Sequence, residues 1–180
     1  MVYVFLANGF EEIEALATVD ILRRVQIPTQ TVGVGGRVVF GAHNIPVTAD
    51  IDDTQVRLNS ELQAVVLPGG GLGTKNLESS SVVQSAINYC MENKILLAAI
   101  CAAPSILGHL GILNGKAATA YPDFQKELRG AALSDEYVIQ DGHIITARGM
   151  GVSIEFGLKI LSALTTEKTA QGIRESIQCP

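Results

Sequence analysis

Short apolar runs that end in glycine or cysteine constrain the fold of this chain more than any other feature. The runs are VYVFL at residues 2–6, LQAVVLP at 62–68 and ILLAAI at 95–100. Apolar runs of this length are typical of strands that are buried on both faces of a parallel sheet. The chain between these runs carries helical patterns instead, so strands and helices are expected to alternate.

The helical patterns and one hairpin complete a fold prediction. Helices are expected over residues 11–24, from the capping serines 79–81 to about Asn93, from Pro104 to Gly111, and over 150–163. In EYVIQDGHIITA, Asp141-Gly142 is a strong turn signal, which indicates a hairpin. The prediction is an α/β fold in one domain, residues 1–180, with a mostly parallel central sheet, helices on both faces and a small hairpin.

Composition excludes several classes of protein. Hydrophobic residues make up 47% of the 180 residues and charged residues 17%, which favours a packed core over disorder. A net charge of −5 without a basic block argues against a dedicated nucleic-acid or anionic-membrane surface. No apolar run approaches the ~20 residues of a membrane span. The start of the chain lacks a basic signal-peptide region, and three widely spaced cysteines fit neither a disulfide framework nor a zinc site, so the expected location is the cytoplasm.

Cys101 stands where the third apolar run stops and a helix begins. A cysteine at such a turn lies near free backbone N–H groups and the positive end of a helix dipole, and both favour the thiolate. This placement is that of a nucleophile elbow, with sulfur in place of the serine oxygen. The alternative is a small core residue at a crowded turn.

Five strand ends carry unusual residues, and the carboxyl ends of strands in open α/β sheets form the ligand crevice. Asn8 to Glu14 follow the first strand, the glycines of GGGLG (69–73) follow another, and Cys101 follows a third. Tyr121 closes the segment AATAY, and Arg148 follows the hairpin. We therefore expect these groups to meet at one site.

Glu14 is the second candidate for a chemical role. Its helical spacing matches Thr18 and Ile21, which predicts an inward side chain, whereas Glu11 and Glu12 are expected to face solvent. Burial would keep Glu14 protonated, so that it donates a hydrogen bond to the thiolate or a proton to a substrate oxygen. The alternative is an exposed first-turn glutamate that interacts with the helix dipole.

The glycine cluster and the histidines are less specific. GGGLG matches no nucleotide fingerprint; it is either a tight turn or a source of backbone N–H groups for an oxyanion, and the two are compatible. His109 lies too far along its helix from Cys101 to touch the sulfur and is interpreted as structural. Nothing in the sequence places His43 or His143 near the crevice.

Four motifs together resemble the DJ/ThiJ/PfpI superfamily, in the branch of the Parkinson-associated protein deglycase and its bacterial relatives. They are GFEEIEA (9–15), VVLPGG (65–70), AAICAAP (98–104) and ARGMGVSIEFGLKI (147–160). The resemblance implies a flavodoxin-like sandwich and a homodimer. It also implies that Cys101 is the nucleophile and Glu14 its protonated partner. By the same resemblance, Gly70 contributes its backbone to the anion pocket, and Arg148 lies near the pocket rim and the dimer interface. Gly69, Ala102 and Tyr121 complete the predicted substrate- or anion-binding residues.

Two positions depart from the pattern of the family. Many members have a histidine where this chain has Tyr121, so the obvious imidazole base is missing. The peptidase branch has a histidine directly after the nucleophile, where this chain has Ala102, which makes protease activity an unfavoured interpretation.

Two functions remain open from the sequence. The first is a glyoxalase or deglycase in which Cys101 attacks methylglyoxal, glyoxal or their early adducts with amines and thiols, and which needs neither a metal nor an organic cofactor. The second is a redox-sensing stress protein or chaperone, switched when peroxide oxidises Cys101 to the sulfinate.

Overall fold

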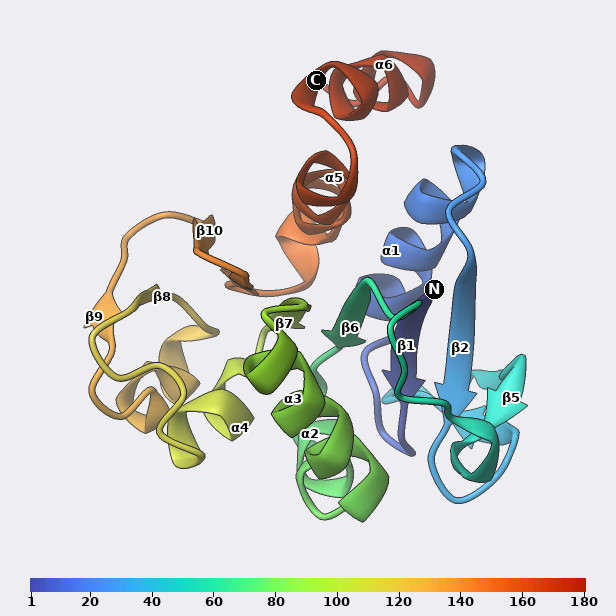
Figure 1. The fold of residues 1–180 in the computed structure, drawn as a ribbon, viewed down its shortest axis with the longest axis vertical. Helices are drawn as coiled ribbons and strands as arrows, with labels where there is room; N and C mark the ends of the chain where they lie inside the picture. Colours follow the sequence, from blue (N-terminus) through green and yellow to red (C-terminus); the bar gives the residue numbers. More distant parts are fainter.

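A seven-stranded sheet forms the centre of the computed structural model, which describes all residues 1–180 (Figure 1). The strand order is β10-β11-β7-β6-β1-β2-β5, and every neighbouring pair is parallel except the β10–β11 hairpin. The strands are β1 (Val2–Leu6), β2 (Thr29–Gly33), β5 (Ile51–Asp52), β6 (Ala64–Leu67), β7 (Leu96–Ile100), β10 (Val138–Asp141) and β11 (Ile144–Ala147). The three apolar runs thus lie side by side as β1, β6 and β7, as the sequence predicted.

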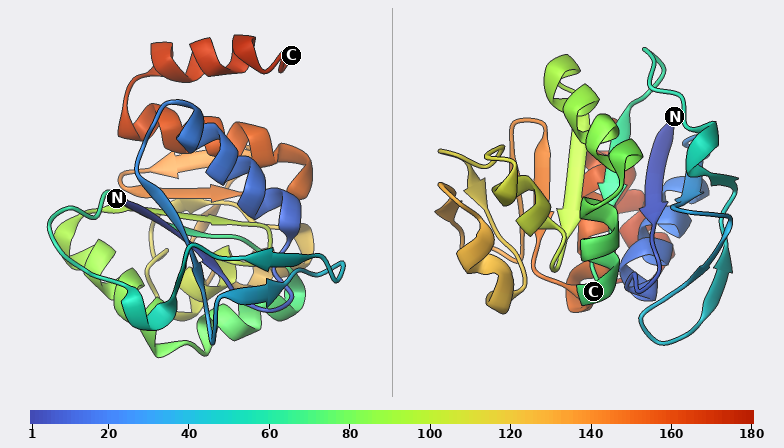
Figure 2. Two further views of the ribbon diagram at one scale, coloured as in Figure 1. Left: turned by 90° about the vertical axis from the view of Figure 1, so that its right-hand side faces the viewer. Right: turned by 90° about the horizontal axis from the view of Figure 1, so that it is seen from below.

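Helices cover both faces of this sheet (Figures 1 and 2). One face packs against α1 (Glu12–Arg24) and α5 (Ser153–Leu164), and the other against α2 (Gly71–Glu78), α3 (Ser81–Asn93) and α4 (Pro104–His109). The last helix, α6 (Glu167–Ser176), packs on the outer side of α5 (Figure 1). Each face contributes a separate cluster of 22 buried apolar residues. Buried side chains on both sides explain why the central strands read as continuous apolar runs.

Local signals placed most of these elements correctly. Ser80 caps α3 by accepting a hydrogen bond from the Val83 amide, and the predicted stripe of α3 is fully buried. That stripe consists of Val83, Ala86, Ile87 and Cys90. The predicted hairpin turns at Asp141-Gly142, where Gly142 has φ +62°.

Three parts of the fold differ from the prediction. Residues 71–78 form α2 directly after the glycine loop, where the sequence indicated only a turn. Only Ala117–Ala118 of AATAY form a strand, β8, and it pairs with β9 (Ala132–Leu133) outside the central sheet. The helix expected over 150–163 begins with a 3₁₀ turn, η3 (Met150–Val152). A separate two-stranded sheet joins β3 (Val38–Phe40) to β4 (Pro46–Thr48), where the sequence indicates a turn into VVF and a short strand or loop near IPVTADI.

Two further 3₁₀ turns connect the main elements, η1 (Asp53–Gln55) and η2 (Pro122–Glu127). No helix is long and apolar enough to cross a membrane. The carboxyl ends of β1, β6 and β7 point toward one edge of the sheet, which places the loops after these strands together.

Candidate active site

Cys101 lies directly after β7 in a left-handed backbone conformation, with φ +65°. Its amide donates a hydrogen bond to the Ala147 carbonyl at 2.9 Å, and its carbonyl accepts one from the Tyr121 amide at 2.8 Å. A positive φ is uncommon outside glycine and persists only where the surroundings hold it. The elbow predicted from the sequence is therefore present, held between the end of β11 and the segment before η2.

Glu14 projects from the first turn of α1 and is fully buried, as its helical spacing predicted. One carboxyl oxygen, Oε2, accepts a hydrogen bond from the Gly69 amide at 2.7 Å, and the other, Oε1, has no hydrogen-bond partner. Desolvation raises the pKa of Glu14 to about 7, although the Gly69 amide and Cys101 oppose the shift. The carboxyl thus changes protonation state near neutral pH.

Gly69 fills the narrow space between these two groups. A Cβ at this position would lie 2.6 Å from the Cβ of Cys101 and 2.8 Å from Oε2 of Glu14. The next residue, Gly70, has φ +88°, and a Cβ there would lie 2.2 Å from the Gly9 carbonyl oxygen. Both positions therefore require glycine, which explains the glycine loop after β6.

Two backbone amides act on the sulfur of Cys101, and they belong to Gly70 and Ala102. Each lowers the pKa of the thiol, as expected for N–H groups that stabilise a negative charge. The Gly69 amide is already bound to Glu14, so Gly69 contributes through its small size. The two amides are placed to stabilise negative charge on the sulfur.

The surroundings of Cys101 act against the thiolate that the sequence predicts. Burial and the Glu14 carboxylate raise the pKa of Cys101 to about 12, against the smaller effect of the two amides. The sulfur lies in a desolvated position before α4, which has only six residues and therefore a short dipole. Burial and the neighbouring carboxylate therefore both disfavour the thiolate in the free protein.

Tyr121 and Arg148 line a cavity of about 540 Å³ at the mouth of this site. Gly149, which also lines it, links the cavity to the nucleophile: a Cβ on Gly149 would lie 3.5 Å from Cδ2 of Tyr121 and 3.9 Å from Sγ of Cys101. The other lining residues are Pro122, Tyr137, Met150, Gly151 and Val152. The sequence reasoning missed Gly149 and Tyr137, although Gly149 lies within the ARGMG segment.

Arg148 is turned toward the rim of the cavity. Its guanidinium carbon lies 5.0 Å from the centre of the Tyr137 ring, and Nη2 lies 3.6 Å from Oδ1 of Asp135. Its Nε is buried without a hydrogen-bond partner. All five predicted strand ends contribute to one region. The segment after β1 does so through Glu14, whereas its Asn8 accepts a hydrogen bond from the Phe40 amide at 2.9 Å.

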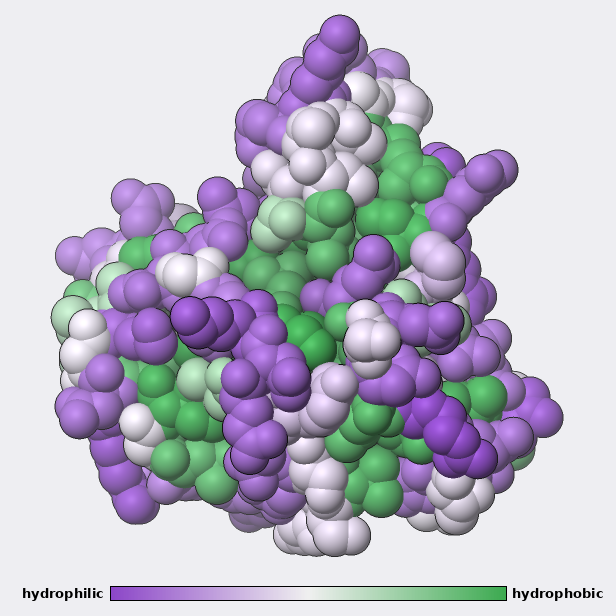
Figure 3. Space-filling view, in the orientation of Figure 1, coloured by the Kyte–Doolittle hydropathy of each residue, from purple (hydrophilic) through white to green (hydrophobic).

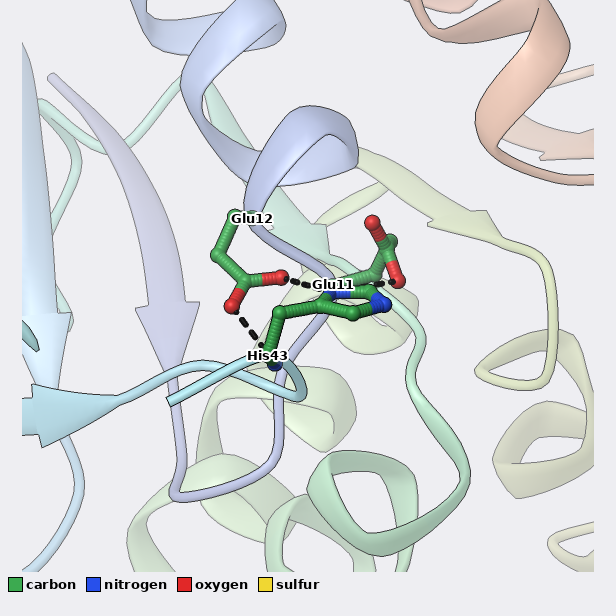
Figure 4. A group of neighbouring side chains, drawn as sticks. All are labelled: Glu11, Glu12 and His43. Carbon is green, nitrogen blue, oxygen red and sulfur yellow. Dashed lines mark hydrogen bonds and ion pairs between the residues drawn. The ribbon is translucent and has the colours of Figure 1, made fainter. Parts of the chain in front are cut away.

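The prediction that Glu12 faces solvent is wrong, because its side chain is buried. Its Oε1 accepts a hydrogen bond from the His43 amide, and its Oε2 lies 2.8 Å from Nδ1 of His43 (Figure 4). The ring hydrogen bond and the charge of the histidine lower the pKa of Glu12 in spite of burial. His43 comes from the turn between β3 and β4, a contact that no local pattern could reveal.

The fold and the site define a class: an α/β protein with a cysteine at a strand-to-helix elbow, beside a buried carboxyl and two free amides. The chain belongs to the DJ-1/PfpI family, whose model matches residues 1–163.

Known proteins resemble this chain over nearly its full length. Protein dj-1beta of Drosophila melanogaster is 34% identical over 177 residues, which cover 97% of this chain and 94% of the relative. The crystal structure of Drosophila DJ-1beta has a TM-score of 0.94 at 33% identity and covers 99% of this chain and 97% of its own. A protein of Schizosaccharomyces pombe named glutathione-independent glyoxalase DJ-1 is 28% identical, covering 99% of this chain and 98% of the relative. The resemblance seen in the sequence motifs is confirmed.

Proposed function

We propose that this protein is a cysteine-dependent glyoxalase or deglycase, with Cys101 as the nucleophile and Glu14 as the acid and base. The observation that carries the proposal is the buried Glu14 carboxyl beside the Cys101 sulfur, with a pKa of about 7. A group that titrates near the working pH is suited to move protons in both directions. The name of the S. pombe relative supports the same chemistry.

The reaction begins when the sulfur attacks the aldehyde carbon of methylglyoxal. Glu14 in its carboxylate form accepts the thiol proton as the C–S bond forms, which overcomes the high pKa of Cys101. The amides of Gly70 and Ala102 stabilise the developing alkoxide, and protonated Glu14 returns the proton to that oxygen. The product of this step is a hemithioacetal on Cys101.

A proton shift and a hydrolysis complete the turnover. Glu14 takes the proton from the carbon that bears sulfur and delivers one to the neighbouring carbonyl carbon, while the hydroxyl proton of the hemithioacetal passes to the former carbonyl oxygen, which gives a lactoyl thioester. Water then cleaves the thioester to lactate and restores the thiol. The sum is methylglyoxal plus water giving lactate, so no redox partner or cofactor is required. For an adduct on an amine or thiol, the same steps release the repaired group.

The test is methylglyoxal consumption and lactate formation without glutathione or added metal. We expect lactate from the wild type and none above background from Cys101→Ser. Cys179→Ser is the matched control, because Cys179 is also partly exposed but lies at the far end of the chain. Lactate formation by Cys101→Ser at the wild-type rate would overturn the assignment of the nucleophile.

Oxidation of Cys101 is a second candidate role, since the same two amides and protonated Glu14 can donate to sulfinate oxygens. Two equivalents of peroxide convert the thiol to the sulfinic acid with release of two waters. Cys90 is fully buried and is not expected to compete. Peptide mapping after mild peroxide treatment tests the role; oxidation of Cys179 ahead of Cys101 contradicts a tuned sensor.

We also propose a homodimer that buries the exposed apolar side chains of α1 and α5. Ile13 and Leu16 on α1 and Ile154 on α5 are between 39% and 52% exposed. Hydrophobic surface is visible between α5 and α1 and across the centre of this face (Figure 3). Leu16→Asp should convert the dimer to a monomer in light scattering, whereas Leu133→Asp on the remote β9 should not.

A further inference from the structure

Outside the site described above, three metal-ligating side chains converge at the start of α1. They are Glu11, Glu12 and His43, and one donor atom from each lies within 4.8 Å of the other two. Figure 4 shows the imidazole ring between the two carboxylates. Nδ1 of His43 lies 2.8 Å from Oε2 of Glu12 and 4.0 Å from Oε2 of Glu11.

Two distant segments of the chain are fixed to each other around this cluster. The Ala42 amide donates to the Phe10 carbonyl at 2.7 Å, which holds the His43 turn against the start of α1. Gly41 is needed beside the Glu12 carboxylate, because a Cβ at position 41 would lie 2.2 Å from Oε1 of Glu12. The donor atoms are therefore positioned before any ligand arrives.

The cluster combines two carboxylates with a single imidazole. The side chains of Glu11 and Glu12 are 16% and 4% exposed, and one imidazole faces both. The Glu11 carboxylate makes no hydrogen bond within the protein, and its nearest cationic atom is Nδ1 of His43 at 4.0 Å. Two carboxylates that face one imidazole leave net negative charge at the cluster, which favours a cation there.

We propose that Glu11, Glu12 and His43 bind one divalent transition-metal cation of the zinc type. Imidazole and carboxylate are ligands of such ions, and a site with three protein ligands leaves one coordination position for water. Ligand atoms on a tetrahedral zinc are about 3.4 Å apart. The separations of 2.8 and 4.0 Å each need to change by about 0.6 Å, which small side-chain rotations supply. His43 is 69% exposed, so the ion can enter from solvent.

His109 provides a matched contrast inside the same chain, because it also contacts two glutamates. Glu78 lies 2.6 Å from Nδ1 and Glu127 lies 3.3 Å from Nε2, on opposite edges of the ring. These carboxylates cannot share one ion with the histidine. Two histidine–glutamate clusters of similar composition therefore differ in whether their donor atoms converge.

The experiment is calorimetric titration of the full chain with zinc sulfate, using protein that carries Cys101→Ser and Cys179→Ser because exposed thiols also bind zinc. We expect one zinc per chain. Glu11→Gln and His43→Gln should each weaken binding by at least about tenfold, as removal of a ligand predicts. Glutamine at 43 keeps a donor toward Glu12, and circular dichroism verifies that each variant is folded.

His109→Gln should bind zinc with the parent affinity. The proposal is overturned if the parent shows no saturable binding, if His43→Gln binds as tightly as the parent, or if His109→Gln weakens binding equally. Stoichiometry and affinity are measured without substrate, so the result is independent of whether the protein turns over methylglyoxal.

Discussion

Gly69 separates Cys101 from Glu14, and no larger residue fits between them. Its amide binds Oε2 of Glu14 at 2.7 Å, while the position of its missing Cβ lies 2.6 Å from the Cβ of Cys101. One residue thus sets both the orientation of the carboxyl and its separation from the sulfur.

Gly69→Ala should therefore lower turnover of methylglyoxal by at least about tenfold and destabilise the fold by about 1–3 kcal/mol, the usual cost of overpacking. Steady-state lactate formation and urea unfolding measure the two effects. Gly71→Ala is the control, because a Cβ at Gly71 meets no atom within 4 Å and alanine favours the first turn of α2. Full activity in Gly69→Ala would contradict the packing argument.

Glu14→Gln should reduce lactate formation by about a hundredfold or more, since an amide accepts a hydrogen bond but cannot transfer a proton. The variant should keep the Gly69 contact and the wild-type fold. Pre-steady-state kinetics with methylglyoxal separate attack by sulfur from the later proton shift. A rate unchanged from the wild type would remove Glu14 from the mechanism.

The same residue gives the protein a pH-dependent stability. The pKa of Glu14 rises from 4.5 to about 7 on folding, so the folded state binds the proton more tightly than the unfolded chain. The favourable contribution is complete below pH 4.5 and is lost as pH rises through 7. Glu14→Gln has no such proton to lose. The difference in free energy of unfolding between the variant and the wild type should therefore shift by about 3 kcal/mol in favour of the variant between pH 4.5 and pH 8. Urea titrations at several pH values measure it, with the exposed Glu92→Gln as the control.

His109 should stabilise the fold at lower pH. The Glu78 carboxylate raises the pKa of His109 first, and Glu127 adds to the shift. This stabilisation is complete below the unfolded pKa of 6.5 and is lost as pH rises through the higher folded value. His109→Gln should cost about 1 kcal/mol at pH 6 and almost nothing at pH 9, because the pair is partly exposed. Thermal melts at the two pH values test the difference, and an equal cost at both would contradict it.

Substitution of Tyr121 tests whether this site lacks the imidazole base that many family members have at the same position. Its ring lies beside Gly149 and the sulfur, so Tyr121→His should place an imidazole near Cys101 and raise lactate formation. Tyr137→His, on the outer wall of the same cavity, is the control and should have little effect. A fall in rate for Tyr121→His would assign a role to the phenol itself.

The parts of the fold and the site that short-range sequence patterns determine were predicted correctly. The apolar runs gave β1, β6 and β7, the helical spacing buried Glu14, and the strand-to-helix transition placed Cys101 at an elbow. These features depend on a few neighbouring residues and on the alternation of strands and helices.

The remaining features depend on contacts between distant segments. Glu12 is buried because Gly41 and His43, about thirty residues later, pack over it. The high pKa of Cys101 arises from desolvation and from Glu14, and neither can be estimated from a local turn. Tyr121 reaches the site through a bond to the Cys101 carbonyl and not through a strand of the central sheet.

The left-handed backbone at Cys101 also determines the side from which chemistry can reach it. One side of Cys101 is packed against Gly69, Gly70 and Glu14. The other side faces the cavity beside Gly149. We therefore expect electrophilic reagents to reach the sulfur through this cavity, which Tyr121 also lines. A series of maleimides of increasing width would act as a molecular ruler for that passage, and the largest one that still alkylates the thiol would report the bulkiest adduct the protein can admit.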